Sequence, residues 1–214
     1  MLVAGRYNGP PTSGNGGYTA GLLATTVGPG TRTVTLRQPP PLDVEMTVDG
    51  LGVLRWGEEI VAVAEDAVIR PEAPAWGDPS TAEAYAGFTD HPFPTCYVCG
   101  PRRPDGLRIF PGRLADGRTA AEWRVPDSVD DVTIWAALDC PGGWAVIGAG
   151  RPYVLGRITV AVDALPEPGE DCVIVGECTG TQGRKGFVRS ALYAADRRVL
   201  AASEAVWISV QTSV

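Results

Sequence analysis

The sequence has 214 residues, of which 44% are hydrophobic and 20% are charged, and these are ordinary values for a globular protein. A fibre, a disordered chain and a membrane protein are poorly supported, since no apolar run approaches the roughly 18 residues that span a bilayer. The net charge of −7 argues against a nucleic-acid partner, because binding to phosphates draws on clustered Lys and Arg. The N-terminus lacks the pattern of a secretory signal and the five cysteines are an odd number, so we expect a cytoplasmic protein with reduced thiols.

The first half of the chain predicts a helix followed by antiparallel strands. An apolar run at residues 18–26 follows two glycines and stops at a Gly-Pro-Gly sequence, which indicates a short helix. Runs rich in Val and Thr then predict strands at residues 33–38, 43–50, 54–60 and 61–69. From residue 70 to residue 94 the chain is rich in Pro, Ala, Asp and Trp, which predicts a connector with one short helix at residues 80–86.

The second half repeats this order. A strand at residues 119–126 precedes a tryptophan-bearing helix at residues 133–139, which we expect Pro141 to break or kink. Further strands are predicted at residues 153–165, 171–180, 186–195 and 199–209. We therefore divide the chain into a first unit at 1–75, a connector at 76–94 and a second unit at 95–214.

Short local matches support an internal duplication. Residues 33–36 (TVTL) align with residues 159–162 (TVAV), each soon after the helix of its half. Residues 64–69 (AEDAVI) align with residues 202–208 (ASEAVWI), each in a last strand. Two units with exposed sheet edges can bury them by pairing edge to edge, so we expect two helix-plus-antiparallel-sheet units that form one continuous curved sheet.

Several segments resemble those of the hotdog superfamily, specifically its double-hotdog acyl-CoA thioesterases. The run Asn15-Gly16-Gly17-Tyr18 is similar to the Gly-Gly opening of the central hotdog helix, and residues 135–139 resemble the part of that helix that carries the catalytic carboxylate. Residues 96–100 with 106–110 are similar to the lead-in of small hotdog proteins of the phenylacetate-pathway type, and residues 186–203 resemble the last hairpin of medium-chain acyl-CoA thioesterases. The resemblance implies an α+β double hotdog.

The resemblance also implies a composite site that hydrolyses acyl-CoA or acyl-carrier thioesters. Asp139 would be the general base or the nucleophile. The N–H groups of Gly16 and Gly17, at the positive end of a helix dipole and next to Asn15, would hold the oxyanion. Aligning the two helices puts Ala24 at the carboxylate position of the first half, so each half contributes a different part of one site.

Five further residues are candidates for binding the substrate. Tyr18 follows the Gly-Gly pair, and Thr159 and Glu204 are substitutes for the hydroxyl and amide that position water in the family, whose glutamine position falls near Val206 here. Arg184 and Lys185, at a turn, could meet CoA phosphates. Because this sequence lacks the family's residues at the water-positioning places, a second hypothesis is a non-catalytic protein that binds acyl thioesters. A hotdog hydratase or dehydratase is disfavoured, because the one histidine lies in none of the motifs of such enzymes.

Simpler interpretations of the same residues remain. Asn15 could be an ordinary helix N-cap, and Asp139 a helix-end residue that closes a turn. Cys96 and Cys99 have the spacing of a zinc knuckle, yet no second pair follows at the expected distance, so we expect structural thiols, no metal and no cofactor. His91 has a turn-like context that predicts a surface role. A homodimer of the whole chain is possible.

Overall fold

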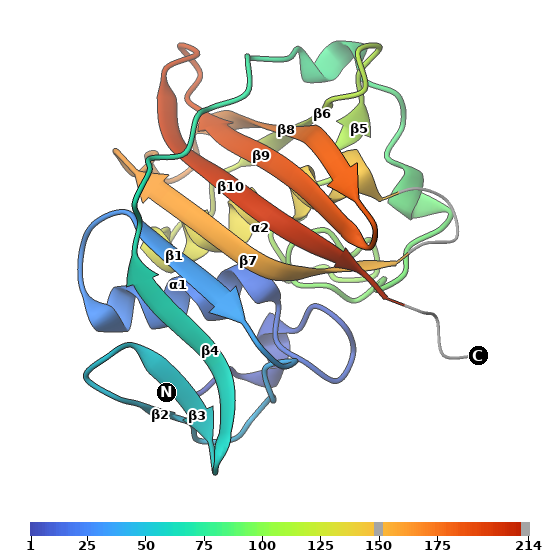
Figure 1. The fold of residues 1–214 in the computed structure, drawn as a ribbon. Coiled ribbons are helices and arrows are strands. Elements are labelled where there is room, and N and C mark those ends of the chain that lie inside the picture. Colours follow the sequence, from blue (N-terminus) through green and yellow to red (C-terminus); the bar gives the residue numbers. More distant parts are fainter. Residues whose placement is uncertain (148–151, 211–214) are drawn as a thin grey trace.

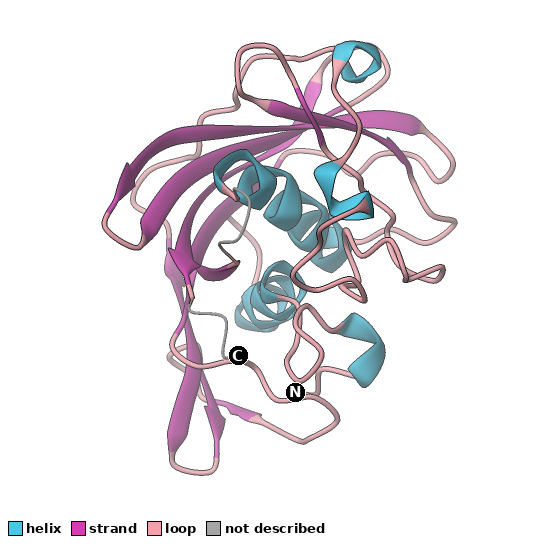
Figure 2. Cartoon of the chain, turned by 90° about the vertical axis from the view of Figure 1, so that its right-hand side faces the viewer, coloured by secondary structure: helices cyan, strands magenta, loops and turns pink. Residues whose placement is uncertain are grey.

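The computed structural model describes residues 1–147 and 152–210, which form two helices and a single ten-stranded antiparallel sheet. The helices lie side by side on the concave face of the curved sheet (Figures 1 and 2). This arrangement confirms the predicted α+β class. Within the described residues, no helix has the length and apolar character needed to cross a membrane.

Helix α1 (Gly16–Val27) begins at the Gly-Gly pair, two residues before the predicted start. Asn15 is its N-cap, and the Asn15 side-chain oxygen accepts a hydrogen bond of 2.8 Å from the backbone N–H of Tyr18. The helix ends at Gly28, whose φ of 130° is a conformation that favours glycine. The N-cap interpretation of Asn15 is therefore confirmed, and it leaves the amide nitrogen of that side chain free for other contacts.

Helix α2 (Asp131–Val146) continues through Pro141, so of the two effects expected of this proline, a break or a kink, the break is wrong. Pro141 has no N–H to donate to the preceding turn, which would destabilise an isolated helix. Thirteen of the sixteen residues of α2 are buried, however, and the Pro141 carbonyl accepts a 2.8 Å hydrogen bond from the Thr119 hydroxyl. Packing on several sides thus outweighs the local preference and carries the helix past Asp139, which is not a helix-end residue.

The sheet is a continuous ladder whose strand order is β2-β3-β4-β1-β7-β10-β9-β8-β6-β5. Strands of the N-terminal half lie on one side of β7 and the remaining strands of the C-terminal half lie on the other (Figure 1). The strands are β1 (Arg32–Leu36), β2 (Thr47–Val48), β3 (Val53–Trp56), β4 (Glu59–Asp66), β5 (Gly112–Arg113), β6 (Thr119–Arg124), β7 (Tyr153–Val162), β8 (Asp171–Gln182), β9 (Lys185–Tyr193) and β10 (Val199–Ser209).

The two halves of the sheet join where β1 pairs antiparallel with β7. Thr33 lies opposite Thr159 in this register, and their hydroxyl oxygens are 2.8 Å apart. These two threonines occupy corresponding places in the matching segments TVTL and TVAV. The predicted edge-to-edge pairing of two sheets is therefore present within one chain.

Several local predictions differ from the structure. Residues 43–50 were expected to form a strand, but only Thr47–Val48 does so. Asp43 has a φ of 58°, and one oxygen of the Asp49 carboxylate accepts hydrogen bonds from the N–H groups of Leu51 and Val53, which makes a turn. The helix expected at residues 80–86 is replaced by 3-10 turns at Pro79–Thr81 and Ala86–Phe88.

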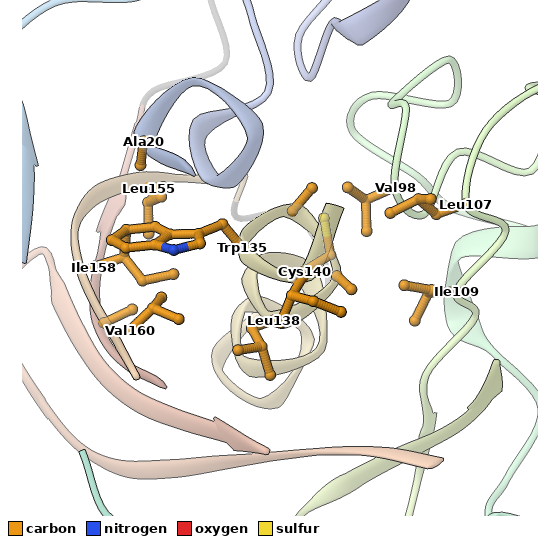
Figure 3. Close-up of a cluster of buried hydrophobic side chains, with 14 of the residues drawn as sticks. Ala20, Val98, Leu107, Ile109, Trp135, Leu138, Cys140, Leu155, Ile158 and Val160 are labelled. Atoms are coloured by element: carbon orange, nitrogen blue, oxygen red, sulfur yellow. The ribbon is translucent and has the colours of Figure 1, made fainter. Parts of the chain in front are cut away.

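The hydrophobic core lies between the helices and the concave face of the sheet. Trp135 and Leu138 of α2 face β7 residues such as Ile158 and Val160, while Val98 and nearby apolar side chains cover the other side of α2 (Figure 3). Alternate residues of β7 face this core, so Thr159, between two almost fully buried neighbours, points to the opposite face.

Candidate active site

A cavity of about 640 Å³ opens where the two halves of the molecule meet. Its walls come from the start of α1 and the end of β1 in the first half, and from α2, the start of β7 and the end of β10 in the second. The polar residues Asn15 and Asp139 reach a wall that is otherwise largely apolar. The apolar part includes Leu36, Phe93, Trp144, Ile147, Tyr153, Leu155, Trp207, Ile208 and Val210.

Asp139 is the buried acid of this site. It lies in the middle of α2 with only 2% of its surface exposed. Its Oδ2 atom accepts hydrogen bonds from the Gly17 N–H at 3.0 Å and from the Asn15 side-chain amide at 3.1 Å. Its Oδ1 atom is buried and has no hydrogen-bond partner within residues 1–147 and 152–210. An unpaired buried polar atom costs about 1–3 kcal/mol, so Oδ1 is the atom of this carboxyl that still has unused hydrogen-bonding capacity.

The surroundings of Asp139 favour its neutral form more than usual. Burial raises the pKa of this carboxyl to about 7, and a nearby sulfur, that of Cys96, acts in the same direction. The hydrogen bonds from the Gly17 N–H and the Asn15 amide oppose this shift. The charged and the protonated carboxyl are then both accessible near neutral pH, as a group that takes and returns a proton requires.

The two glycines at the start of α1 have different positions relative to this acid. Gly17 contacts it directly, since a Cβ at that position would lie 2.5 Å from the Asp139 Cβ, and its N–H is already bound to the carboxylate. Gly16 lines the cavity, and its N–H has no hydrogen-bond partner in the described part of the chain. The amide that is free to polarise a carbonyl is therefore that of Gly16, whereas the Gly17 amide holds the acid.

The site is asymmetric between the two helices. Asn15 caps α1 and Asp130 caps α2, and each accepts a hydrogen bond from the N–H three residues later. At equal distances from these caps stand Ala24 in α1 and Asp139 in α2, and both are buried. Only the second helix has a carboxylate at this place, in agreement with the alignment of the two helices.

The residues predicted to bind substrate lie outside this cavity. Tyr18 stacks on Tyr7 with ring centroids 3.9 Å apart. Thr159 and Glu204 are neighbours in the register of β7 and β10 and line a second hollow, on the sheet face turned away from the helices. Side chains on that face cannot position water beside the acid, because the sheet itself lies between them.

Arg184 and Lys185 are exposed on the hairpin between β8 and β9. The Arg184 carbonyl accepts a 2.8 Å hydrogen bond from the N–H of Ser209. The neighbouring residues Ile208 and Val210 line the cavity, so this basic hairpin runs beside one of its walls.

Three cysteines form a cluster that the spacing in the sequence did not reveal. The sulfur atoms of Cys96, Cys99 and Cys140 lie within 4.8 Å of one another, and all three residues line the cavity. Hydrogen bonds among the thiols hold the pKa of Cys96 well below its usual range and raise that of Cys140. Cys140 directly follows Asp139 but is 44 residues from Cys96, so only the fold brings it to the Cys-x-x-Cys pair.

His91 also differs from its prediction. It is half-buried and lines the cavity, with its Nε2 atom 3.4 Å from the Cys99 sulfur. Its Nδ1 atom accepts a 2.9 Å hydrogen bond from the N–H of Phe93. The turn-like context was correct, but the turn folds inward against Trp144 and Tyr85, so the surface role is wrong.

Comparison with known proteins places this architecture in a structural class. A conserved protein of unknown function with a hotdog fold from Alicyclobacillus acidocaldarius superposes with a TM-score of 0.62 at 15% identity, over 97% of this chain and 91% of that one. A suggested thioesterase II from Thermobifida fusca superposes with a TM-score of 0.56 at 15% identity, over 94% and 88% of the two chains. No protein-family model matches the sequence, and no curated protein matches it. The chain is a hotdog-fold protein whose two helices and continuous sheet make a double hotdog, as the resemblance predicted.

Proposed function

We propose that this protein hydrolyses acyl-CoA or acyl-carrier thioesters in the cavity between its two halves. The observation that carries the proposal is the environment of Asp139, a residue of the cavity lining whose Oδ2 atom is fixed by two donors, while its buried Oδ1 atom has no hydrogen-bond partner among the described residues. The full-length structural likeness to a suggested thioesterase supports the same reaction class.

In the proposed reaction the thioester carbonyl points at the free N–H of Gly16, at the positive end of the α1 dipole. Asp139 takes a proton from water through Oδ1 while the water oxygen attacks the carbonyl carbon. The tetrahedral oxyanion is held by the Gly16 amide. Its collapse breaks the carbon–sulfur bond, and Asp139 returns the proton to the thiolate that leaves. Direct attack by the same Oδ1 atom, followed by hydrolysis of the anhydride, uses the same geometry.

The second candidate is an acyl-thioester binding protein without turnover. It is favoured by the positions of Thr159 and Glu204, which lie on the opposite face of the sheet and leave the attacking water without these two partners. In either case the exposed Arg184 and Lys185 are suited to the phosphates of CoA at the cavity edge.

The test compares two Asp→Asn variants of α2 on a panel of acyl-CoA thioesters. Asp139→Asn keeps the size of the side chain and an oxygen for the Gly17 and Asn15 donors but removes the base, so we expect hydrolysis to fall by about 10²–10⁴-fold. Asp130→Asn is the matched control, because asparagine also caps helices well, and it should retain activity. Loss of thioester absorbance is followed directly, since a thiol reagent would also react with the protein.

The possible results separate the two candidates. Undiminished turnover by Asp139→Asn would eliminate this acid as the catalytic group. Binding of an acyl-CoA by calorimetry, with no hydrolysis of any thioester by the wild type, would instead establish the binding protein.

A further inference from the structure

The cluster of Cys96, Cys99 and Cys140 has the dimensions of a metal-binding site. The sulfur atoms of Cys96 and Cys140 are 3.9 Å apart. Tetrahedral zinc with Zn–S bonds of about 2.3 Å separates two thiolate sulfurs by about 3.8 Å, whereas a disulfide requires about 2.05 Å. All three residues are at most 4% exposed, so the sulfurs are shielded from bulk water except at the cavity.

Surrounding N–H groups donate hydrogen bonds to two of these sulfurs. The Trp144 indole N–H is 3.5 Å from the Cys99 sulfur, and the Asn15 amide is 3.8 Å from the Cys96 sulfur. Donors directed at sulfur stabilise thiolates, and partners of this kind orient and tune metal ligands. The two donors would favour thiolates at Cys99 and Cys96, and a divalent cation would provide the matching positive charge for the cluster.

His91 belongs to this set of donors rather than to the ligands. Because its Nδ1 atom accepts the Phe93 N–H, the neutral ring carries its proton on Nε2, which is the atom 3.4 Å from the Cys99 sulfur. A metal would need the lone pair of that same nitrogen. The geometry therefore provides three sulfur ligands and leaves the fourth position of a tetrahedron for a ligand from outside.

We propose that Cys96, Cys99 and Cys140 bind one Zn²⁺ or a similarly soft divalent ion as three thiolates, with the fourth coordination position turned toward the cavity. Soft thiolate ligands select such ions, and three protein ligands with one open position are typical of zinc that meets a substrate or water. Asn15 donates to both Cys96 and Asp139, so it links the metal site to the proposed acid. The metal site does not depend on thioester hydrolysis.

Metal content and ligand number test the proposal without any measurement of turnover. Purified wild-type protein, loaded with Zn²⁺ and desalted, should hold about one ion per chain, and X-ray absorption should show three sulfurs at about 2.3 Å with one lighter atom. Each of the variants Cys96→Ser, Cys99→Ser and Cys140→Ser should lose most of the bound zinc. Cys178→Ser, a half-buried cysteine outside the cluster, is the control and should keep it. Because the wild-type spectrum is sufficient alone, a variant that fails to fold leaves the test valid.

A second probe examines the role of His91 and the open position. With Co²⁺ in place of zinc, His91→Ala should keep the positions of the absorption bands. The affinity for the ion should fall about tenfold or more, because Cys99 loses the hydrogen bond from His91. Added mercaptoethanol should shift these bands by entering the fourth position. The proposal would be overturned by a folded wild-type protein that holds no zinc after loading, or by a Cys96–Cys140 disulfide in mass spectrometry. Four protein ligands in the wild type, or a changed ligand set in His91→Ala, would also overturn it.

Discussion

Gly17 is the point where the backbone of α1 comes closest to the acid, so Gly17→Ala changes the proposed site directly. The new Cβ would lie 2.5 Å from the Asp139 Cβ and 2.7 Å from the Trp135 carbonyl oxygen. Carbon atoms in contact are about 3.5–4.0 Å apart, so the helices must separate locally by about 1 Å. The 3.0 Å hydrogen bond from the Gly17 N–H to the carboxylate would then be lost.

The expected loss follows from three contributions. Overpacking costs about 1–3 kcal/mol and the lost bond to a charged group about 1.5–3 kcal/mol. Alanine in a helix returns about 1 kcal/mol relative to glycine. We therefore expect the free energy of unfolding to fall by about 1.5–5 kcal/mol. Because a 1 Å displacement of a catalytic group lowers rates about 100-fold, kcat/KM should fall by that factor.

Gly21→Ala is the matched control, one turn further along the same face of α1. Its Cβ would lie 2.6 Å from the Trp135 Cβ, so it overpacks the same helix contact without touching the acid. Urea unfolding should show losses of stability for both variants, whereas hydrolysis of an acyl-CoA should be much more impaired in Gly17→Ala. Equal kcat/KM values for the two variants would refute the role of Gly17 in holding the carboxylate.

Three further predictions concern the cap, the junction and the basic hairpin. Asn15→Ser keeps a capping oxygen and Asn15→Ala does not, so the free energy of unfolding of the alanine variant should be about 1 kcal/mol lower than that of the serine variant. Both variants lose the amide donor to Asp139, so kinetic assays should show a similar loss of activity in the two. In a double-mutant cycle of Thr33→Val and Thr159→Val, urea unfolding should give a coupling of about 0.5–1.5 kcal/mol, and additive effects would exclude the hydroxyl pair as a stabilising contact. Replacing Arg184 or Lys185 by Ala should raise KM for acyl-CoA about threefold and leave KM for acyl-pantetheine unchanged, and this difference should shrink in high salt. An unchanged KM for acyl-CoA would show that the hairpin does not contact the phosphates.

Local pattern was sufficient for the long strands of the second half. Alternate residues of these strands face the core, and turn residues stand at their ends. The hydrophobic periodicity and the turn residues therefore predict the same strand boundaries. Local pattern failed where tertiary contacts dominate, as at Pro141, whose helix is held by burial rather than by its own hydrogen bonds. The prediction also failed at residues 43–50, where one side-chain oxygen of Asp49 accepts two backbone N–H groups and makes a turn.

The candidate site was predictable to the extent that it depends on helix starts. A Gly-Gly pair after a capping residue and an acid inside a second helix are local features, and aligning the two caps pairs Ala24 with Asp139. The thiol cluster depends on the approach of a loop and a helix that are distant in sequence. Cys140 and His91 give no local sign of that approach, because one lies within an apolar helix and the other in a proline-rich turn.

Both ends of the ten-strand ladder are strands of two residues, β2 and β5. A free strand edge is what allows one chain to extend its sheet into another, and such short edges offer few N–H and C=O groups for that purpose. The long strands, which would make good templates for aggregation, all lie inside the ladder because the two halves cover one another. The two-residue terminal strands therefore limit how far another chain could extend this sheet at either end.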